Sequence, residues 1–344
     1  MAGTFKFRKG LVVADLSGGV MQFGVDPRCA LRLTGLATCE VKWLRDVGAR
    51  RHLSLRAAAS WAGVSDARRD QILEALGAAG ALVCENSRRK LPALTAPGGG
   101  VADVQALGAL RFDGAGKLTL LQRARAAIAL TVIDRLGALI ALNLATAGVG
   151  RLILPDDAAV EPGDVGFGAY LDGAVGCSRY ASLATRLRQV CPSIQVTPDG
   201  VADLTVVLGA HRVGPERVVR LMGQGAPHLA ITMREADVIV GPLVIPGETP
   251  CLRCVDLWRA EQDPWWEALW TQLPSQAPSE ALLVASAAAL ATGQVLAFID
   301  QARPVTLRGE LEVALPQAIA QFRTIESHRE CGCTRLMSKA APVA

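Results

Sequence analysis

Four of the nine cysteines form two close pairs that could bind one metal ion. Cys251 and Cys254 make a C-x-x-C motif, and Cys331 and Cys333 make a C-x-C motif near the C-terminal end. Each pair can offer two thiolates from one tight turn, and together they would complete a tetrahedral site of four sulfur ligands. Zinc is favoured over an iron–sulfur cluster because no other motif indicates redox chemistry. The sequence therefore predicts a structural zinc site without an open catalytic position.

Two alternatives at these cysteines carry less weight. A redox-active C-x-x-C would need a thioredoxin-like strand and helix around it, and the flanking sequence does not supply them. His328, three residues before Cys331, is a less favoured ligand. The odd total of nine cysteines argues against a secreted disulfide framework and for a reducing cytoplasm. The remaining ones are scattered among apolar residues: Cys29, Cys39, Cys84, Cys177 and Cys191.

A second candidate site lies in the segment Ala127–Glu161. An apolar run over 127–132 predicts a buried strand, a helical run follows to about residue 147, and a second buried strand covers 151–154. Asp156 follows about 20 residues after the turn, as the ribose-binding acid does in a βαβ nucleotide-binding unit. Further alternation of strands and helices predicts a doubly wound, mostly parallel, Rossmann-like α/β sheet.

The turn of this βαβ unit lacks the residues that bind phosphate. In the G-x-G-x-x-G frame, Val132 and Asp134 stand at the first two glycine positions, and only Gly137 is retained. A branched side chain and a carboxylate then lie where backbone amides should approach a polyphosphate, and like charges repel strongly in a partly desolvated turn. We therefore predict a degenerate nucleotide site that does not bind ATP.

Composition limits the class of protein. With 344 residues, 51% of them hydrophobic and 20% charged, the chain is long enough for two soluble domains. The net charge of +4 is too small to favour nucleic acid as a partner. The N-terminus shows no signal peptide, and we find no apolar run approaching the roughly 18 residues of a membrane span. These features predict a cytoplasmic protein with no membrane partner.

Turn signals and composition divide the chain into four parts. We expect a small α+β winged-helix domain over 1–86, a linker or connecting layer over 87–125, an α/β domain over 126–338, and a tail over 339–344. Within the connecting layer, 107–112 and 118–121 are predicted to form a hairpin across a glycine-containing turn. The first domain should contain three strands, then three helices including a helix–turn–helix pair, then a closing strand.

The first 85 residues resemble the PqqD-type element that captures leader peptides of ribosomally made, modified peptides. The resemblance rests on the phrase DPRCALRLTGL, the helix after it, and the pattern AGV-x-x-A-R. It implies that a strand edge and the third helix hold an extended peptide by β-augmentation. The implied contacts are Ala30, Leu31, Arg32, Leu33, Arg68, Arg69 and Ile72.

Residues 127–335 resemble the ThiF/MoeB superfamily of ubiquitin-activating-type adenylyltransferases. The matching stretches are RLGALIALNLATAGVGRLILPDDAAVE, VGCSRYASLATRLRQVCPSIQV, ADLTVVL, PGETPCLRCVDLWR and HRECGC. With the N-terminal element, the whole chain resembles the leader-binding, ThiF-like partner of YcaO-type cyclodehydratases, which make azolines in peptides. The resemblance implies a structural zinc ion and a homodimer. It also implies that the YcaO partner holds the ATP and performs the chemistry.

Several residues that serve ATP chemistry in the superfamily are replaced here. Asp156 matches the ribose-binding aspartate, and Arg179 stands in place of a lysine. The positions of a second acid, of the asparagine–x–x–arginine pair and of the magnesium-binding aspartate fall on Ala158, Asp164, Phe167 and Ala210 or His211. Because phosphoryl chemistry depends on such placed charges, the combined losses argue against acyl-adenylate formation.

The sequence thus favours a non-catalytic subunit that binds a leader peptide and presents it to a YcaO-type enzyme. Two alternatives stay open: an active adenylyltransferase that uses Asp156 and Arg179 on a carrier-protein C-terminus, and a DNA-binding regulator that uses the winged helix. A tryptophan-rich stretch could serve core packing, dimer packing or partner binding, and an alanine-rich helix over 279–300 could pack closely against another helix. The tryptophans are Trp258, Trp265, Trp266 and Trp270.

Overall fold

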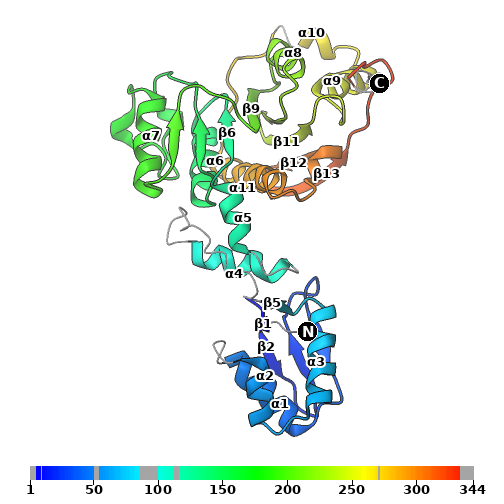
Figure 1. Ribbon diagram of the computed structural model, residues 1–344. Coiled ribbons are helices and arrows are strands. Elements are labelled where there is room, and N and C mark those ends of the chain that lie inside the picture. The colour runs from blue at the N-terminus through cyan, green and yellow to red at the C-terminus, as the bar shows by residue number, and fades with distance from the viewer. Residues whose placement is uncertain are drawn as a thin grey trace, which may run out of the picture. The chain divides into compact units, whose positions relative to one another are not determined.

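The computed structural model describes residues 5–8, 10–49, 54–84, 100–111, 116–269 and 272–333 (Figure 1). The chain divides into two compact units, which are described separately. The first comprises residues 1–94 and 98–121, and the second comprises residues 95–97 and 122–344. Residues 87–99 of the predicted linker lie outside the described residues, as do the predicted tail and Trp270.

The first unit contains two small antiparallel sheets. One pairs β1 (Phe5–Phe7) with β5 (Leu82–Cys84), and the other has the order β2 (Val13–Asp15), β3 (Met21–Phe23), β4 (Leu31–Leu33). The two glycines of the predicted turn, Gly18 and Gly19, both adopt positive φ, which allows the tight reversal between β2 and β3. Within the described residues β4 pairs only with β3, so its other side is an edge of this sheet.

Three helices cover these strands. They are α1 (Thr38–Ala49), α2 (Leu55–Trp61) and α3 (Asp66–Ala78). Ser65 caps α3, because its hydroxyl accepts a hydrogen bond from the amide of Arg68. Trp43 is buried at the centre of the unit and donates from Nε1 to the carbonyl oxygen of Leu55 over 2.9 Å. The indole therefore contributes apolar contact and a hydrogen bond that joins α1 to α2.

The predicted hairpin in the connecting layer is wrong. The structure has two helices there, α4 (Val101–Leu110) and α5 (Gly116–Arg123). A β-carbon on Gly116 would lie 2.3 Å from the carbonyl oxygen of Val104, so glycine is required where α5 begins beside α4. The glycine that indicated a β-turn therefore serves a close approach of two backbones, and the apolar residues around it follow a helical period.

The second unit is built on one eight-stranded sheet, in the order β13-β12-β11-β10-β9-β6-β7-β8. Strands β6 to β10 run parallel, whereas β11, β12 and β13 follow in antiparallel pairs. The predicted mostly parallel α/β sheet is confirmed. The strands are β6 (Ala127–Leu130), β7 (Arg151–Ile153), β8 (Gln195–Thr197), β9 (Leu204–Ala210), β10 (His228–Met233), β11 (Asp237–Val244), β12 (Gly309–Ala314) and β13 (Ile319–Thr324).

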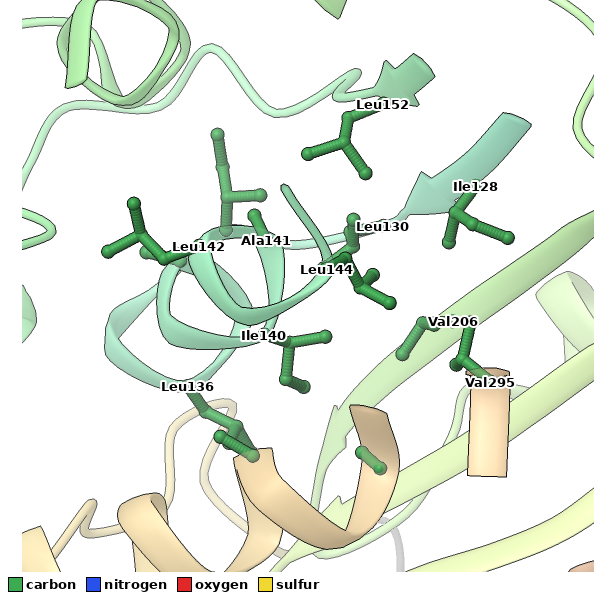
Figure 2. Packing of buried hydrophobic residues seen from close by; sticks show 14 of the residues in the cluster. Ile128, Leu130, Leu136, Ile140, Ala141, Leu142, Leu144, Leu152, Val206 and Val295 are labelled. Atoms are coloured by element: carbon green, nitrogen blue, oxygen red, sulfur yellow. The ribbon is translucent and has the colours of Figure 1, made fainter. Parts of the chain in front are cut away.

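Two helices form the central part of the core over this sheet. Apolar residues of α6 (Arg135–Thr146), including Ile140 and Leu144, pack with Ile128 and Leu130 of β6 and with Val295 of α11 (Ala281–Ile299) (Figure 2). The other helices are α7 (Arg179–Val190), α8 (Pro215–Gly223), α9 (Leu252–Gln262) and α10 (Trp266–Leu269), with short 3-10 turns at Pro162–Asp164, Asp172–Ala174 and Val305–Arg308. This packing fixes the start of α6 at the carboxyl end of β6.

The prediction that no apolar run approaches the length of a membrane span is wrong for helix α11. Its 19 residues are long and apolar enough to cross a membrane. Gly293 and Gln294 interrupt the apolar residues but do not greatly lower the mean hydropathy of the helix. However, 44% of the tested window is buried inside the structure, and α11 packs along α6 and the sheet. A core helix passes the same test, so the finding is weak evidence for a membrane.

Candidate functional site

A cavity of about 660 Å³ lies at the carboxyl ends of β6, β9 and β10. In open α/β sheets this edge is where ligands bind, and the volume is typical of a small-molecule site. The inner wall is apolar and includes Leu208, Ile231 and Met233. Charged side chains complete the lining: Asp134, Arg135, Glu161, Asp164 and Arg179. Three of the predicted degenerate nucleotide residues, Val132, Asp134 and Arg179, therefore line this cavity.

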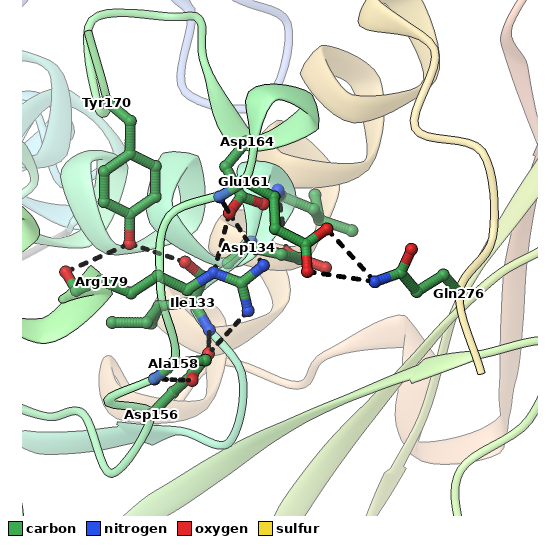
Figure 3. Close-up of polar contacts among 11 residues, drawn as sticks. Ile133, Asp134, Asp156, Ala158, Glu161, Asp164, Tyr170, Arg179 and Gln276 are labelled. Carbon is green, nitrogen blue, oxygen red and sulfur yellow. Dashed lines mark hydrogen bonds and ion pairs between the residues drawn. The ribbon is translucent and has the colours of Figure 1, made fainter. Parts of the chain in front are cut away.

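Asp134 occupies the amino terminus of α6. Its Oδ1 accepts hydrogen bonds from the amides of Leu136 and Gly137, each over 3.0 Å (Figure 3). These are the backbone donors that a helix N-terminus would offer to a phosphate. Burial raises the pKa of Asp134, and the charge of Asp164 adds to the rise. The protein thus supplies its own anion to these donors.

Gly137 and Val132 hold the turn in a narrow geometry. A β-carbon on Gly137 would lie 2.2 Å from the carbonyl oxygen of Val132, so the helix begins too close to the strand end for any other residue. Val132 is partly buried and lines the cavity. The retained glycine therefore serves close helix–strand packing. Val132, in contrast, stands where the glycine-rich frame has its first glycine, and it places a side chain in the cavity wall.

Arg179 lies between two carboxylates at the start of α7. Its Nε donates to Oδ2 of Asp164 over 2.8 Å, and its Nη1 lies 3.3 Å from Oδ2 of Asp156 (Figure 3). Burial opposes the charged form, but the hydrogen bond to Asp164 and the surrounding carboxylates raise the pKa of Arg179. The guanidinium is consequently an internal ion-pair partner, and a ligand phosphate would have to displace a carboxylate to reach it.

Asp156 is held by backbone as well as by Arg179. Its Oδ2 accepts from the amide of Ile133 over 2.9 Å, and its Oδ1 accepts from the amide of Ala158 over 3.1 Å. The buried hydroxyl of Tyr170 donates to the carbonyl oxygen of Ile133 over 2.7 Å. Burial, with the nearby carboxylates, raises the pKa of Tyr170, so this hydroxyl stays protonated. The polar groups around the turn therefore have their hydrogen-bond partners within the protein.

The mouth of the cavity is bridged by two contacts. Gln276 donates from Nε2 to both carboxylate oxygens of Glu161, over 3.2 and 3.3 Å (Figure 3). Arg135 donates from Nη1 to the carbonyl oxygen of Ser279 over 2.8 Å, and its guanidinium lies 5.2 Å from the centre of the Phe167 ring. Arg135, Tyr170 and Gln276 were not predicted as site residues, because their contacts join segments that are distant in sequence.

The second candidate site is the cysteine cluster. Sγ atoms of Cys251 and Cys331 are 3.6 Å apart, those of Cys254 and Cys333 are 3.5 Å apart, and all four lie within 4.8 Å of one another. Four sulfurs at zinc-bond length from one ion would be about 3.8 Å apart. All four cysteines are buried, and together they join the start of α9 to the C-terminal segment. The residues present fit a structural zinc ion.

His328 is placed for a supporting role beside this cluster. Its Nε2 lies 3.1 Å from Oε1 of Glu261, and its Nδ1 accepts from the amide of Glu330 over 3.2 Å. The ring also stands edge-on to Trp258, with centroids 4.6 Å apart. Since both ring nitrogens have protein partners, the four cysteines form the better ligand set.

The predicted peptide contacts in the first unit divide into buried and exposed residues. Ile72 is only 4% exposed and belongs to the core, and Arg69 is largely buried between Asp66 and Asp70. On β4, in contrast, Arg32 is exposed and Leu31 and Leu33 are partly buried, and the preceding residue, Ala30, is exposed. The strand edge is therefore more accessible than two of the three helix positions.

Arg68, on α3, contacts both α1 and the segment that follows β4. Its Nε donates to Oε1 of buried Glu40 over 2.8 Å, and its Nη2 donates to the carbonyl oxygen of Gly35 over 3.2 Å. Glu40 in turn accepts from the amide of Ala37 over 2.8 Å. Arg68 thus positions the segment between β4 and α1, while its side chain stays 38% exposed.

The tryptophans in the second unit have different environments. Trp258 donates from Nε1 to the carbonyl oxygen of Glu326 over 2.9 Å, and Arg259 lies over the ring of Trp266 at 5.2 Å. Trp265 is 76% exposed. Within the described part of this stretch, two tryptophans serve local structure and one is available to another molecule.

Comparison with known proteins supports the fold. No family model matches the sequence. The vegetative HesA protein of Trichormus variabilis is 31% identical over 153 residues, a match that covers 40% of this chain and 57% of HesA. A crystal structure of E. coli MccB with succinimide aligns with a TM-score of 0.70 and 15% identity, covering 96% of this chain and 99% of MccB.

The chain has the fold of MccB. A structure of PaaA also aligns, with a TM-score of 0.70 and 14% identity over 92% of this chain and 98% of PaaA. MccB is a microcin C7 biosynthetic enzyme, and other structures of it contain ATP or N-formylated MccA. At such low identity these neighbours establish the ThiF-type fold alone, which is the fold that the sequence predicted for the larger part of the chain.

Proposed function

We propose that this protein binds the leader of a ribosomally made precursor peptide and presents the peptide to a separate, YcaO-type modifying enzyme in the cytoplasm. In this proposal its ThiF-like unit does not adenylate. The main observation in its support is the placement of Asp134. Its carboxylate accepts hydrogen bonds from the amides of Leu136 and Gly137 at the N-terminus of α6.

The electrostatics of the cavity support the absence of ATP chemistry. A triphosphate would have to enter beside Asp134, Glu161 and Asp164, while both lining arginines already contact protein acceptors. Releasing Arg179 would leave Asp156 and Asp164 without their cation in a partly buried site, which typically costs several kcal/mol. Electrostatic placement is most of what an enzyme contributes to phosphoryl transfer, so this site is poorly suited to it.

The edge of β4 is the proposed peptide site, within a unit that we interpret as a winged helix of the PqqD kind. Its outer edge lacks a strand partner among the described residues, and Arg32, the middle residue of β4, is exposed. An extended leader could add a strand there, with main-chain hydrogen bonds giving affinity and side chains giving selectivity. MccB, which shares the fold, has been crystallised with the peptide MccA.

This peptide site can be tested with fluorescent synthetic leader peptides. Arg32→Glu reverses a charge on the proposed edge, whereas Arg28→Glu reverses an exposed charge on the turn before β4 and serves as the control. We expect at least about a tenfold weaker anisotropy-derived Kd for Arg32→Glu only. Equal Kd values for the two variants and the unmodified protein would remove β4 from the proposal.

The zinc ion and a homodimer complete the proposed assembly. A zinc ion held by the four cysteines would keep the C-terminal segment on α9 and would supply folding stability rather than catalysis. A pair of subunits would offer two leader sites to the partner enzyme. Neither role requires chemistry in the cavity.

One second function has support. The cavity of about 660 Å³ is large enough for a nucleotide, and MccB structures with the same fold contain ATP. An active adenylyltransferase would use Asp156 at the ribose and Arg179 at a phosphate after rearrangement of their ion pairs. Magnesium-dependent release of pyrophosphate on addition of a peptide would favour this function over presentation.

A further inference from the structure

A second, smaller cavity lies between α9 and the strands β12 and β13, with a volume of about 320 Å³. Leu311 and Val313 of β12 pack into the core that contains α11. Because side chains alternate along a strand, Glu310 points to the opposite face, where it contacts Arg259 of α9. The cavity is therefore on the face of the sheet away from α11. Its volume is at the lower end of the range for small-molecule sites.

Glu310 is a buried carboxylate in the wall of this cavity. Both of its carboxylate oxygens lie 3.4 Å from Nη2 of Arg259, which is longer than the about 2.7–2.9 Å of a charge-assisted hydrogen bond. Within the described part of the chain, Arg259 supplies the only donors to this carboxylate. Burial raises the pKa of Glu310, although the charge of Arg259 opposes the rise. The cavity thus contains an acid whose capacity to accept hydrogen bonds is largely unused.

Trp258 forms an apolar wall in a fixed orientation. Its Nε1 donates to the carbonyl oxygen of Glu326 over 2.9 Å, and the ring of His328 stands edge-on to it. Since the polar group of the indole already has its partner, the ring presents apolar surface to the cavity. Val255 and Ile325 also line the cavity. These three side chains can receive the apolar part of a ligand.

Arg323 supplies a cation at the opening. It is the cross-strand partner of Glu310, so the two side chains share one face of the sheet. Its side chain is 60% exposed, and its Nη2 lies 2.6 Å from Oε2 of Glu312. A guanidinium has five N–H donors in a planar fork. Arg323 can therefore keep its contact with Glu312 and still donate to a ligand carboxylate.

The charges that line the cavity cancel. Arg259 and Arg323 are balanced by Glu310 and Glu326. A ligand with only a positive charge would be repelled by two arginines, and one with only a negative charge would be repelled by two glutamates. A ligand that carries one charge of each sign adds no net charge and can pair with both kinds of residue. The lining is therefore complementary to a small zwitterion with an apolar side chain.

We propose that this cavity binds a free α-amino acid with an apolar side chain. The ammonium group pairs with Glu310, the carboxylate pairs with Arg323, and the side chain lies against Trp258. The bound amino acid contacts both α9 and the strands β12 and β13. This cavity shares no lining residue with the cavity at α6 or with the proposed leader site.

The test is calorimetric titration of the full-length, zinc-loaded protein with L-leucine. We expect saturable heat with a Kd below about 1 mM. Isoamylamine is leucine without its carboxylate, and isocaproate is leucine without its ammonium group. Each analogue should bind at least about tenfold more weakly, because each leaves one charged residue of the site without its partner.

Two variants assign the heat to this cavity. Glu310→Gln keeps the side-chain volume and removes the negative charge, and Arg323→Gln removes the exposed cation. Both should bind leucine at least about tenfold more weakly. Arg329→Gln is the matched control, since Arg329 is an exposed arginine that also pairs with a glutamate but does not line the cavity. It should bind leucine as the unmodified protein does. Thermal unfolding and zinc content would show that all three variants are folded.

Three results would each overturn the amino-acid site. They are no saturable heat with leucine up to about 10 mM, an analogue that binds as tightly as leucine, and undiminished binding of leucine by folded Glu310→Gln or Arg323→Gln. Tight binding of isoamylamine would identify a site for basic groups instead. Arg32→Glu, which tests the leader site, should leave leucine binding unchanged, so the two proposals can fail separately.

Discussion

The cavity beside α6 and the cysteine cluster beside α9 are both built from ionisable side chains, but they differ in how those groups are satisfied. At the cavity, acids and arginines pair with each other and with backbone amides, as Arg179 does with Asp156 and Asp164. At the cluster, four thiols converge on one point and cannot satisfy one another as thiolates. A site whose charges neutralise one another therefore has little need for a charged ligand, whereas a site of four like ligands requires a cation.

The largest effect should follow loss of the metal. Cys254→Ser removes one of four ligands, and because metal binding energy is folding energy, we expect loss of the bound zinc and a destabilisation of at least about 5 kcal/mol. Zinc content by atomic spectroscopy and thermal unfolding would measure both. Cys177→Ser, at an exposed cysteine outside the cluster, is the matched control. Equal zinc content and equal Tm in the two variants would show that the cluster is not a zinc site.

The next effect concerns the ion pairs at the cavity. Arg179→Met keeps an apolar stem but leaves Asp156 and Asp164 without their cation, so we expect a loss of about 3–5 kcal/mol in the free energy of unfolding. Arg188→Met, on the same helix, provides the control. Urea denaturation would measure the difference. A cost below about 1 kcal/mol would mean that Arg179 behaves as a surface ion pair and remains available to a ligand.

The smallest effect concerns the capping carboxylate. Asp134→Asn should preserve the cap of α6, because asparagine caps helices as well as aspartate does. Burial raises the pKa of Asp134 in the folded state, so folding favours its protonated form. The unmodified protein should therefore lose stability as pH rises from the ordinary aspartate pKa through the raised one, and Asp134→Asn should not lose this contribution.

Thermal unfolding of both proteins over that pH range would show a difference in Tm that grows with pH and then levels off. Asp199→Asn, at an exposed loop residue, should show no such trend. A constant difference in Tm across the range, or one that shrinks with rising pH, would indicate that Asp134 titrates at or below its ordinary pKa.

Local patterns in the sequence predicted the features that depend on near neighbours. Cys251 and Cys254 are close because of their spacing, and apolar runs identified β6 and α6 as a βαβ unit. Asp134 was correctly expected to lie at the turn, since it is fixed by the helix start. The pairing of Arg179 with Asp164 was not predicted, because it joins α7 to a 3-10 turn through space.

Features that depend on distant segments were missed or misassigned. The bridge from Gln276 to Glu161 joins residues far apart in the chain, and no local pattern indicates it. In the first unit, Gly116 was interpreted as part of a β-turn, although its role is to let α5 approach the backbone at Val104. Both errors concern which groups meet in space, which spacing alone does not encode.

The most direct test of the account is a calorimetric titration of zinc-loaded protein with magnesium and ATP. If Asp134 occupies the helix N-terminus and Arg179 is held by its own carboxylates, no saturable heat should appear up to millimolar nucleotide. Asp134→Asn should not bind either, since Arg179 stays engaged. A titration of the unmodified protein that saturates at one nucleotide per chain would contradict the account and would make an adenylyltransferase the leading function.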